Sequence, residues 1–291
     1  MAYPTEPLRE HPSTYFVQDR ENQEEMDRLE IQDKMATAGM GGVLPEQPDP
    51  TRFRRVLDVG CGTGEWLLET ARTYPTLEKL FGADISGKMV DYARAKAEAQ
   101  QLEKRVQFKT MDALRFLEFP DASFDLVNQR AAFSWLRTWE WTKILSEYQR
   151  VTRHGGIIRI TEPHTWSGGN SPALTKLCDI LLLAMHRAGH LFTASHDGMT
   201  RELTRLMTEH GIQDVQTRLH TLVYSRGTAE FHYFYEDMVR FYRVAVPFLN
   251  KWTNVPSDYQ EIYQQALIEM QEPGFSTTVM LLTAWGIRPQ R

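Results

Sequence analysis

Short apolar runs alternate with amphipathic stretches through the middle of this chain, and this alternation predicts a sheet covered by helices. The apolar runs are rich in Val, Ile, Leu and Phe, as buried strands are. The stretches between them repeat apolar residues with helical spacing. Strands alternating with helices favour stacked β-α units and a mostly parallel sheet. The predicted strands are residues 55–59, 79–83, 106–110, 124–128 and 156–161, and the predicted helices are 65–73, 88–101 and 139–151.

The regular alternation stops after residue 162, and a different pattern follows. Two late segments, 213–224 and 276–285, have the pattern of strands, and helical stretches surround them. Late strands separated by helices indicate a sheet that is completed only after an inserted helical cap. We expect this cap to choose the substrate. The helices predicted here are 171–188, 198–210, 230–248 and 258–270.

The N-terminal region has a composition of its own. Residues 1–20 are rich in Pro, Glu and Arg and read as an arm, and residues 21–38 have helical spacing that ends at a glycine cluster. Three prolines within residues 45–50 indicate a linker. We therefore expect an N-terminal arm and helix over 1–50, a core domain over 51–162, and a cap with the last two strands over 163–291.

Composition and charge narrow the range of partners. With 291 residues and 42% hydrophobic content, the chain can bury a sizeable core. The net charge is −5 with both signs scattered, so no basic stripe is present and nucleic acid is not an expected partner. The chain shows no secretory pattern and no long apolar run, so we expect a cytoplasmic protein without integral membrane association. Cys61 and Cys178 are too few for a disulfide framework or a zinc site, and we expect no metal.

The segment VLDVGCGTG at residues 56–64 carries the strongest chemical signal. An apolar strand runs into Gly60, Gly62 and Gly64, and glycines allow a sharp turn with a ligand lying against the backbone. A dinucleotide-binding motif needs a further glycine where Glu65 stands. That carboxylate would disfavour a pyrophosphate but suits a cofactor that carries sulfonium and ammonium groups. The segment therefore argues against a nicotinamide-dependent dehydrogenase.

This segment resembles motif I of the class I, S-adenosylmethionine-dependent methyltransferases. The run FPDASFD at 119–125 is similar to the entry into strand four of small-molecule members. The resemblance implies a Rossmann-like fold with seven mostly parallel strands and helices on both faces. It also implies S-adenosyl-L-methionine as cofactor and S-adenosyl-L-homocysteine as product.

The resemblance further implies which residues bind the cofactor. Asp84, at the end of the second strand, corresponds to the acidic residue that receives both ribose hydroxyls, and a carboxylate can accept two such bonds. Asp112 corresponds to the acceptor from the adenine amino group. The alternatives are local: Asp84 or Ser86 caps the next helix, and Asp112 shapes a turn. The complete expected set is Asp58, Gly60, Cys61, Gly62, Gly64, Asp84, Ile85, Met89, Met111, Asp112, Ala113, Asn128 and Arg130.

Methyl transfer needs a nucleophile held in line with the methyl carbon, and orientation alone contributes roughly 7–11 kcal/mol. A general base must also lie near the proton of the nucleophile. Glu162 and His164 follow the fifth predicted strand, whose carboxyl end faces the ligand crevice. We expect His164 to be the base or an orienting group, with Glu162 as its partner or as a substrate acceptor. A helix-capping or surface role for this histidine is the alternative.

Aromatic residues are dense around the expected pocket. Phe133 and Trp135 follow strand four, while His232 and Tyr235 lie in the cap, and we expect these four to bind the substrate. Aromatic faces suit a flat or prenylated molecule and stabilise a positive charge by roughly 0.5–2 kcal/mol each. The alternative for most of the aromatics is the hydrophobic core.

Tyr15 and the predicted helix 21–38 form a third candidate feature. In small-molecule methyltransferases, N-terminal helices close over the cofactor, which implies that Tyr15 brings its hydroxyl to the active site. Closure occurs within one subunit or by exchange of helices in a homo-oligomer. Packing of the arm on the surface is the alternative.

The layout resembles ubiquinone and menaquinone methyltransferases and related C-methyltransferases of secondary metabolism, including indolactam-terpenoid C-methyltransferases of the teleocidin type. The resemblance implies methyl transfer to a small, largely apolar natural product or quinone-like acceptor. For a prenylated or terpenoid acceptor it implies C-methylation, with cyclisation through a carbocation. The alternatives are an O- or N-methyltransferase of a small aromatic metabolite, and a cyclase or binding protein that holds the cofactor without transferring its methyl group.

Overall fold

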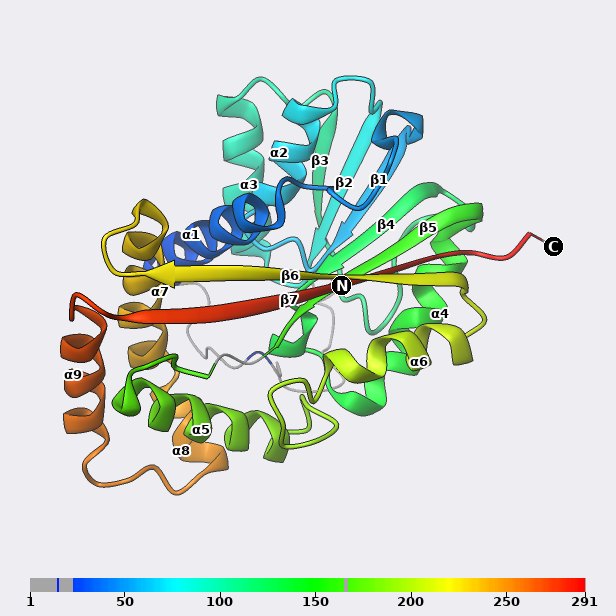
Figure 1. The fold of residues 1–291 in the computed structure, drawn as a ribbon. Coiled ribbons are helices and arrows are strands. Elements are labelled where there is room, and N and C mark those ends of the chain that lie inside the picture. Colours follow the sequence, from blue (N-terminus) through cyan, green and yellow to red (C-terminus); the bar gives the residue numbers. More distant parts are fainter. Residues whose placement is uncertain (1–14, 16–22, 165–166, 291) are drawn as a thin grey trace, which may run out of the picture.

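The computed structural model describes residue 15 and residues 23–164 and 167–290 (Figure 1). Within them, seven strands form one sheet in the order β3-β2-β1-β4-β5-β7-β6. Strands β1 to β5 run parallel, whereas β7 is antiparallel to both β5 and β6. The predicted α/β, mostly parallel, Rossmann-like sheet is confirmed. The strands are β1 Arg55–Val59, β2 Lys79–Asp84, β3 Val106–Thr110, β4 Phe124–Arg130, β5 Thr152–Pro163, β6 Gln213–Ser225 and β7 Ser276–Ile287.

Helices cover both faces of the sheet. Strand residues alternate between two hydrophobic cores: Val56 and Leu126 belong to one, and Leu57 and Val127 belong to the other. The first core lies under α2 and α3, and the second lies under α4 and the cap. The helices of the central domain and its edge are α2 Glu65–Thr73, α3 Gly87–Ala99, α4 Trp141–Val151 and α6 Leu203–Glu209.

The cap is built on a two-stranded ribbon that extends past the rest of the sheet. Strand β7 pairs with β5 only as far as Leu281, opposite Pro163, but it pairs with β6 as far as Ser276, opposite Ser225. Figure 1 shows this ribbon reaching toward α7 and α9. Helices α5 and α9 pack together beside it, and α7 packs on β6. The cap helices are α5 Pro172–Arg187, α7 Ala229–Val244, α8 Val246–Trp252 and α9 Tyr259–Met270.

Two predicted helices differ from the structure. The stretch 230–248 is two helices, α7 and α8, because Pro247 sits in the first turn of α8, where its missing N–H interrupts a continuous helix. The stretch 198–210 begins with turns and a short 3-10 helix, Thr200–Glu202, before α6 starts. None of the described helices is long and apolar enough to cross a membrane.

Helix α1, Gln23–Met40, lies between the central domain and the cap. It packs against α7 and β6 on one side and against α2 on the other. It ends at Gly41 and Gly42, whose φ angles of 85° and 125° are in the region that favours glycine. The predicted helix 21–38 is therefore present and bridges both parts of the molecule.

A buried polar chain crosses three neighbouring strands. Asp58, Asn128 and Arg159 lie side by side on β1, β4 and β5. Asn128 donates to Asp58 Oδ1 at 2.7 Å and accepts from Arg159 Nη1 at 2.7 Å, while Arg159 Nε donates to Glu46 Oε1 at 2.7 Å. Burial alone would raise the pKa of Glu46, but the charge and hydrogen bonds of Arg159 hold it below its ordinary value. The linker is thereby fixed to the sheet.

We expect Arg159→Met to lower the free energy of unfolding by about 3–5 kcal/mol, because it leaves the fully buried Glu46 carboxylate without its cation. The double variant Arg159→Met/Glu46→Gln removes that charge and should recover part of the loss. Urea denaturation, followed by circular dichroism, measures the free energy of unfolding of the wild type and of both variants. Equal destabilisation by the single and double variants would contradict this account.

Candidate active site

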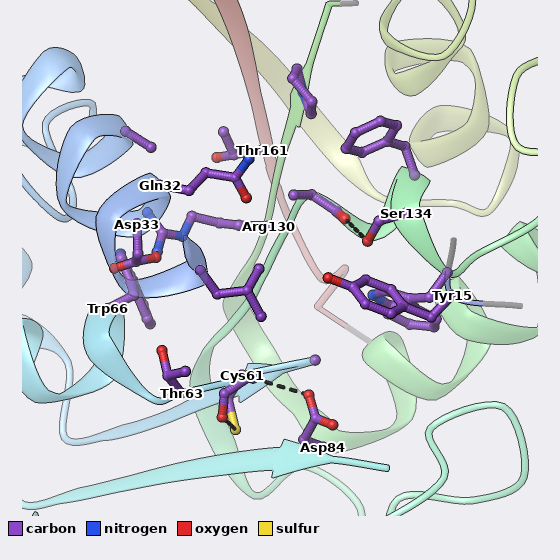
Figure 2. Close-up of a pocket in the computed structure, with 18 of the residues that line it drawn as sticks. Tyr15, Gln32, Asp33, Cys61, Thr63, Trp66, Asp84, Arg130, Ser134 and Thr161 are labelled. Atoms are coloured by element: carbon purple, nitrogen blue, oxygen red, sulfur yellow. Dashed lines mark hydrogen bonds and ion pairs between the residues drawn. The ribbon is translucent and has the colours of Figure 1, made fainter. Parts of the chain in front are cut away.

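A cavity of about 530 Å³ opens at the carboxyl ends of β1, β2, β4 and β5, between α1 and the cap (Figure 2). One half is bounded by the turn after β1 and by the ends of β2 and β3. The other half is bounded by the β6–β7 ribbon, α7 and the segment after β4. The two halves are continuous, so two ligands could meet inside one space.

The turn after β1 fits a ligand that approaches the backbone closely. Gly60, Gly62 and Gly64 have φ angles of 69°, 50° and 75°. A Cβ on Gly60 would meet the Trp135 indole at 3.1 Å, and one on Gly64 would meet Phe108 at 2.6 Å. A Cβ on Gly62 would meet nothing within 4 Å and would occupy cavity space. The middle of the turn is therefore an open cradle that a side chain would fill.

Asp84 ends β2 at the floor of this cradle, and Figure 2 shows it beside Cys61. Its Oδ2 accepts from the Gly62 amide at 3.0 Å and its Oδ1 accepts from the Ser86 amide at 2.8 Å. Ser86 caps α3 by accepting from the Met89 amide at 3.3 Å. Asp84 thus braces the turn and faces the cavity, and both roles are compatible with one carboxylate.

The loop after β3 supplies the side of the same half. Met111, Asp112 and Ala113 all line the cavity, as do Ile85 and Met89. Asp112 Oδ1 accepts from the Leu114 amide at 2.9 Å, so the residue also shapes its own turn. These side chains form a largely apolar slot that fits a flat ring.

Asp58 lines the cavity, whereas Asn128 is fully buried behind it. Burial raises the pKa of Asp58 to about 7, although the hydrogen bond from Asn128 and the charge of Arg159 act in the opposite direction. Asn128 therefore reaches a ligand only through Asp58.

Arg130, at the end of β4, projects into the cavity toward α1 (Figure 2). It forms an ion pair with Asp33, donates to Thr37 Oγ1 at 3.1 Å, and lies 5.8 Å from the Trp66 ring. Burial, together with the charge of Arg159, lowers the pKa of Arg130 to about 9. This side chain links the central domain to α1.

Glu162 and His164 have different neighbours, although we expected the two side chains to act together. The fully buried Glu162 carboxylate accepts from Gln129 Nε2 at 2.8 Å and from the amides of Ala132 and Phe133 at 2.8 and 3.0 Å. Burial raises the pKa of Glu162 to about 7. Glu162 thereby holds the segment that follows β4.

His164 is half-buried, its electrostatic neighbours are Asp197 and His196, and burial lowers its pKa. His164 is not among the residues that line the cavity, whereas Pro163, next to it, is.

Tyr15 lines the cavity, and its hydroxyl donates to Glu25 Oε1 at 2.7 Å. Burial and the charge of Glu25 raise the pKa of Tyr15 well above its ordinary value, so the phenol is neutral. The remaining arm residues, 1–14 and 16–22, lie outside the described residues.

Of the four residues that we expected to bind the substrate, two line the cavity and two do not. Phe133 and Trp135 line the cavity. His232 is exposed and pairs with Glu236 at 3.1 Å, and Tyr235 packs near Phe231 outside the cavity. Several residues of the inner wall belong to no motif in the sequence, although alternation along β6 and β7 and helical spacing along α7 could have indicated them. They are Leu222, Tyr224, Met238 and Leu281.

Among Tyr15, 23–164 and 167–290, no three or more His, Cys, Asp or Glu side chains are grouped as a metal site would need.

Comparison with known proteins identifies the central domain. Residues 56–156 match the family model of a methyltransferase domain. Demethylmenaquinone methyltransferase of Deinococcus radiodurans is 42% identical over 109 residues, covering 38% of this chain and 43% of the relative. Ajmaline N-methyltransferase of Rauvolfia serpentina is 38% identical over 117 residues, covering 40% of this chain and 38% of the relative. The chain spans less than half the length of these curated relatives.

Solved structures share the fold over most of the chain. Phosphoethanolamine N-methyltransferase 2 of Haemonchus contortus, in complex with S-adenosyl-L-methionine, has a TM-score of 0.56 at 17% identity and covers 94% of this chain and 60% of that one. Geranyl diphosphate C-methyltransferase of Streptomyces coelicolor A3(2), with S-adenosyl-L-homocysteine, has a TM-score of 0.52 at 12% identity and covers 97% and 91%. At these identities the likeness concerns the fold alone. Residues 56–156, which include the glycine cradle and Asp84, therefore match a methyltransferase domain within a fold that methyltransferases of known structure share.

Proposed function

We propose that the protein transfers a methyl group from S-adenosyl-L-methionine to a small, largely apolar acceptor bound under the cap. The observation that carries the proposal is the continuity of the cavity, which joins the glycine cradle to an inner wall of aromatic and aliphatic side chains. Demethylmenaquinone and ajmaline methyltransferases, to which the central domain is similar, are named for small-molecule acceptors. Their names support the acceptor class.

The residues of the cavity could hold the cofactor in one orientation. The cofactor supplies an electrophilic methyl carbon on a sulfonium. Asp84 would accept from two hydroxyl donors, in addition to the amides of Gly62 and Ser86, and a ring would lie in the slot of Met111 and Ala113. Asp58 and Arg130 carry opposite charges, which suit an ammonium and a carboxylate group. These residues would leave the inner half of the cavity to the acceptor.

The chain's own contribution to transfer is orientation, exclusion of water and removal of a proton. Phe133 and Trp135 form part of the wall that would hold the acceptor, and Glu162 fixes the segment that carries them. We propose His164, which directly follows the cavity-lining Pro163, as the proton acceptor; burial lowers its pKa, which favours the neutral imidazole that a base requires. Tyr15, as a neutral phenol in the cavity, would orient the acceptor.

For the finer chemistry we propose C-methylation of a prenylated or terpenoid acceptor, with cyclisation of the resulting carbocation. Aromatic faces on the inner wall support this, because they stabilise positive charge in a water-poor space. O- or N-methylation of an aromatic metabolite is the alternative within the same class, and a non-methylating cyclase is the alternative of another class. Tyr15 and α1 reach the cavity within one chain here, and a homo-oligomer with exchanged helices stays a prediction.

Asp84→Asn should weaken binding of S-adenosyl-L-homocysteine by about a hundredfold, because a charged acceptor for two hydroxyls contributes about 3 kcal/mol. Asp91→Asn is the matched control, since Asp91 is exposed on α3 and pairs only with Arg94 at 2.9 Å. Calorimetric titration measures the affinity of both variants for S-adenosyl-L-homocysteine. Unchanged affinity in Asp84→Asn would remove this residue from the cofactor site.

Affinity for S-adenosyl-L-homocysteine should rise with pH through about 7 and level off above, if an ionised Asp58 receives the ammonium group. Between its ordinary pKa and about 7, folded Asp58 keeps a proton that the unfolded chain has released. Stability without ligand therefore falls as pH rises through that window. Calorimetry from about pH 5.5 to about pH 8.5 tests this. Asp58→Asn should flatten the profile, and an identical profile in that variant would contradict the assignment.

Incubation with methyl-labelled cofactor and a geranylated indole should yield carbon-bound label and an equal amount of S-adenosyl-L-homocysteine. His164→Asn should reduce kcat by about 10²–10⁴-fold without weakening cofactor binding. His232→Asn is the control, because His232 is exposed on the cap. Label on oxygen or nitrogen would support the alternative transfer, and cofactor binding without S-adenosyl-L-homocysteine formation would contradict the proposed activity.

A further inference from the structure

A group of buried polar side chains joins α1 to α7 on the inner wall of the cavity. Arg28 Nε and Nη2 each donate to Glu25 at 2.7 Å, and Nη1 donates to Asp237 Oδ1 at 3.0 Å. The Tyr15 hydroxyl donates to Glu25 Oε1 at 2.7 Å. We call Tyr15, Glu25, Arg28 and Asp237 the α1–α7 quartet. Three of its members, Tyr15, Arg28 and Asp237, line the cavity.

The quartet carries an excess of negative charge. Its two carboxylates face one guanidinium, and Glu25, Arg28 and Asp237 are only 1%, 1% and 4% exposed. Arg240, outside the quartet, lies 3.7 Å from Glu236, measured from Nη2 to Oε2, and its charge also acts on Asp237, against the burial that raises the pKa of that carboxyl group. A buried carboxylate that shares its cation with another is costly without a further positive partner. A ligand with one positive charge would make the quartet neutral.

One oxygen of the quartet has no donor from the protein. Both Glu25 oxygens and Asp237 Oδ1 accept from Arg28. For Asp237 Oδ2, no hydrogen-bond donor is found among residue 15 and the described ranges 23–164 and 167–290. Because Asp237 lines the cavity, this oxygen is available to a bound molecule.

The surroundings of Asp237 suit a cation with an apolar body. Tyr224 stacks on Phe234 with ring centroids 4.8 Å apart, and both line the cavity. The Phe241 ring already lies 5.5 Å from the Arg28 guanidinium. Burial, together with the charge of Asp237, raises the pKa of Tyr224, which keeps this phenol neutral beside the carboxylate. Aromatic faces attract cations most strongly where water is excluded.

We propose that the acceptor carries a protonated amine, which donates to Asp237 Oδ2 while the apolar body of the molecule extends toward the glycine cradle. Asp237 is then a specificity-determining residue. The inference rests on the proposed function and names its substrate class: an apolar acceptor with a basic nitrogen remote from the methylated atom. The same carboxylate would repel acceptors that end in a phosphate.

Calorimetric titration of geranylamine and geraniol into protein saturated with S-adenosyl-L-homocysteine tests the proposal, since the two probes differ only in their polar end. We expect geranylamine to bind about tenfold more tightly or better. Asp237→Asn should remove most of that preference. Glu261→Gln should keep it, because it deletes an exposed carboxylate on α9 that does not line the cavity.

Equal affinities of the two probes for the wild-type protein would overturn the proposal, as would an undiminished preference in Asp237→Asn. Circular dichroism checks the fold of each variant, and the wild-type comparison decides the matter if Asp237→Asn does not fold. Binding of S-adenosyl-L-homocysteine is measured first. Its failure would contradict the proposed function and this inference together, whereas cofactor binding without amine preference would contradict this inference alone.

Discussion

The charged contacts of α1 are the constraint on which the cavity depends. On one side, Glu30 pairs with Lys96 and Asp33 pairs with Arg130 of the central domain. On the other side, Arg28 pairs with Asp237 of the cap. Apolar contacts add to these pairs: Met26 and Met40 of α1 are buried, and Met35 and Ala36 pack half-buried against the core. Removing one partner of the buried Arg28–Asp237 pair would leave the other charge uncompensated and destabilise the contact between α1 and the cap.

This arrangement relates the cofactor half to the acceptor half. Arg130 ends β4 next to the glycine cradle, and Asp237 lies on α7 in the inner wall. Helix α1 contacts both through side chains less than two turns apart, Arg28 and Asp33. The glycines that end α1 allow left-handed backbone there, and a Cβ on either would meet nothing within 4 Å. Helix α1 thus forms an ion pair beside each expected ligand position, with Arg130 next to the cofactor half and with Asp237 next to the acceptor half.

Local sequence signals predicted the central domain well. The bounds of the strands at 55–59 and 106–110 agree with the structure, because apolar runs bounded by turn residues encode them directly. The glycine cradle could be found for the same reason: Gly60, Gly62 and Gly64 are close in sequence, and their spacing reflects one turn. The splitting of 230–248 at Pro247 could also have been predicted, since proline ends a continuous helix.

Long-range pairings could not be predicted. Arg28 and Asp237 are 209 residues apart, and no local pattern marks either as a partner of the other. Glu162 looked like a catalytic carboxylate because it follows a strand, but its oxygens are bound by Gln129 and the backbone after β4, which only the fold brings together. Likewise, the inner wall forms where the β6–β7 ribbon extends past the sheet, and its length depends on the register of pairing.

A crystal structure of the protein with S-adenosyl-L-homocysteine would test the central claim most directly. The account predicts the ribose hydroxyls on Asp84, the adenine in the slot of Met111 and Ala113, and the sulfur facing Phe133 and Trp135 across open space beneath α1. A nucleoside bound elsewhere, or protein atoms separating the sulfur from the inner wall, would contradict it.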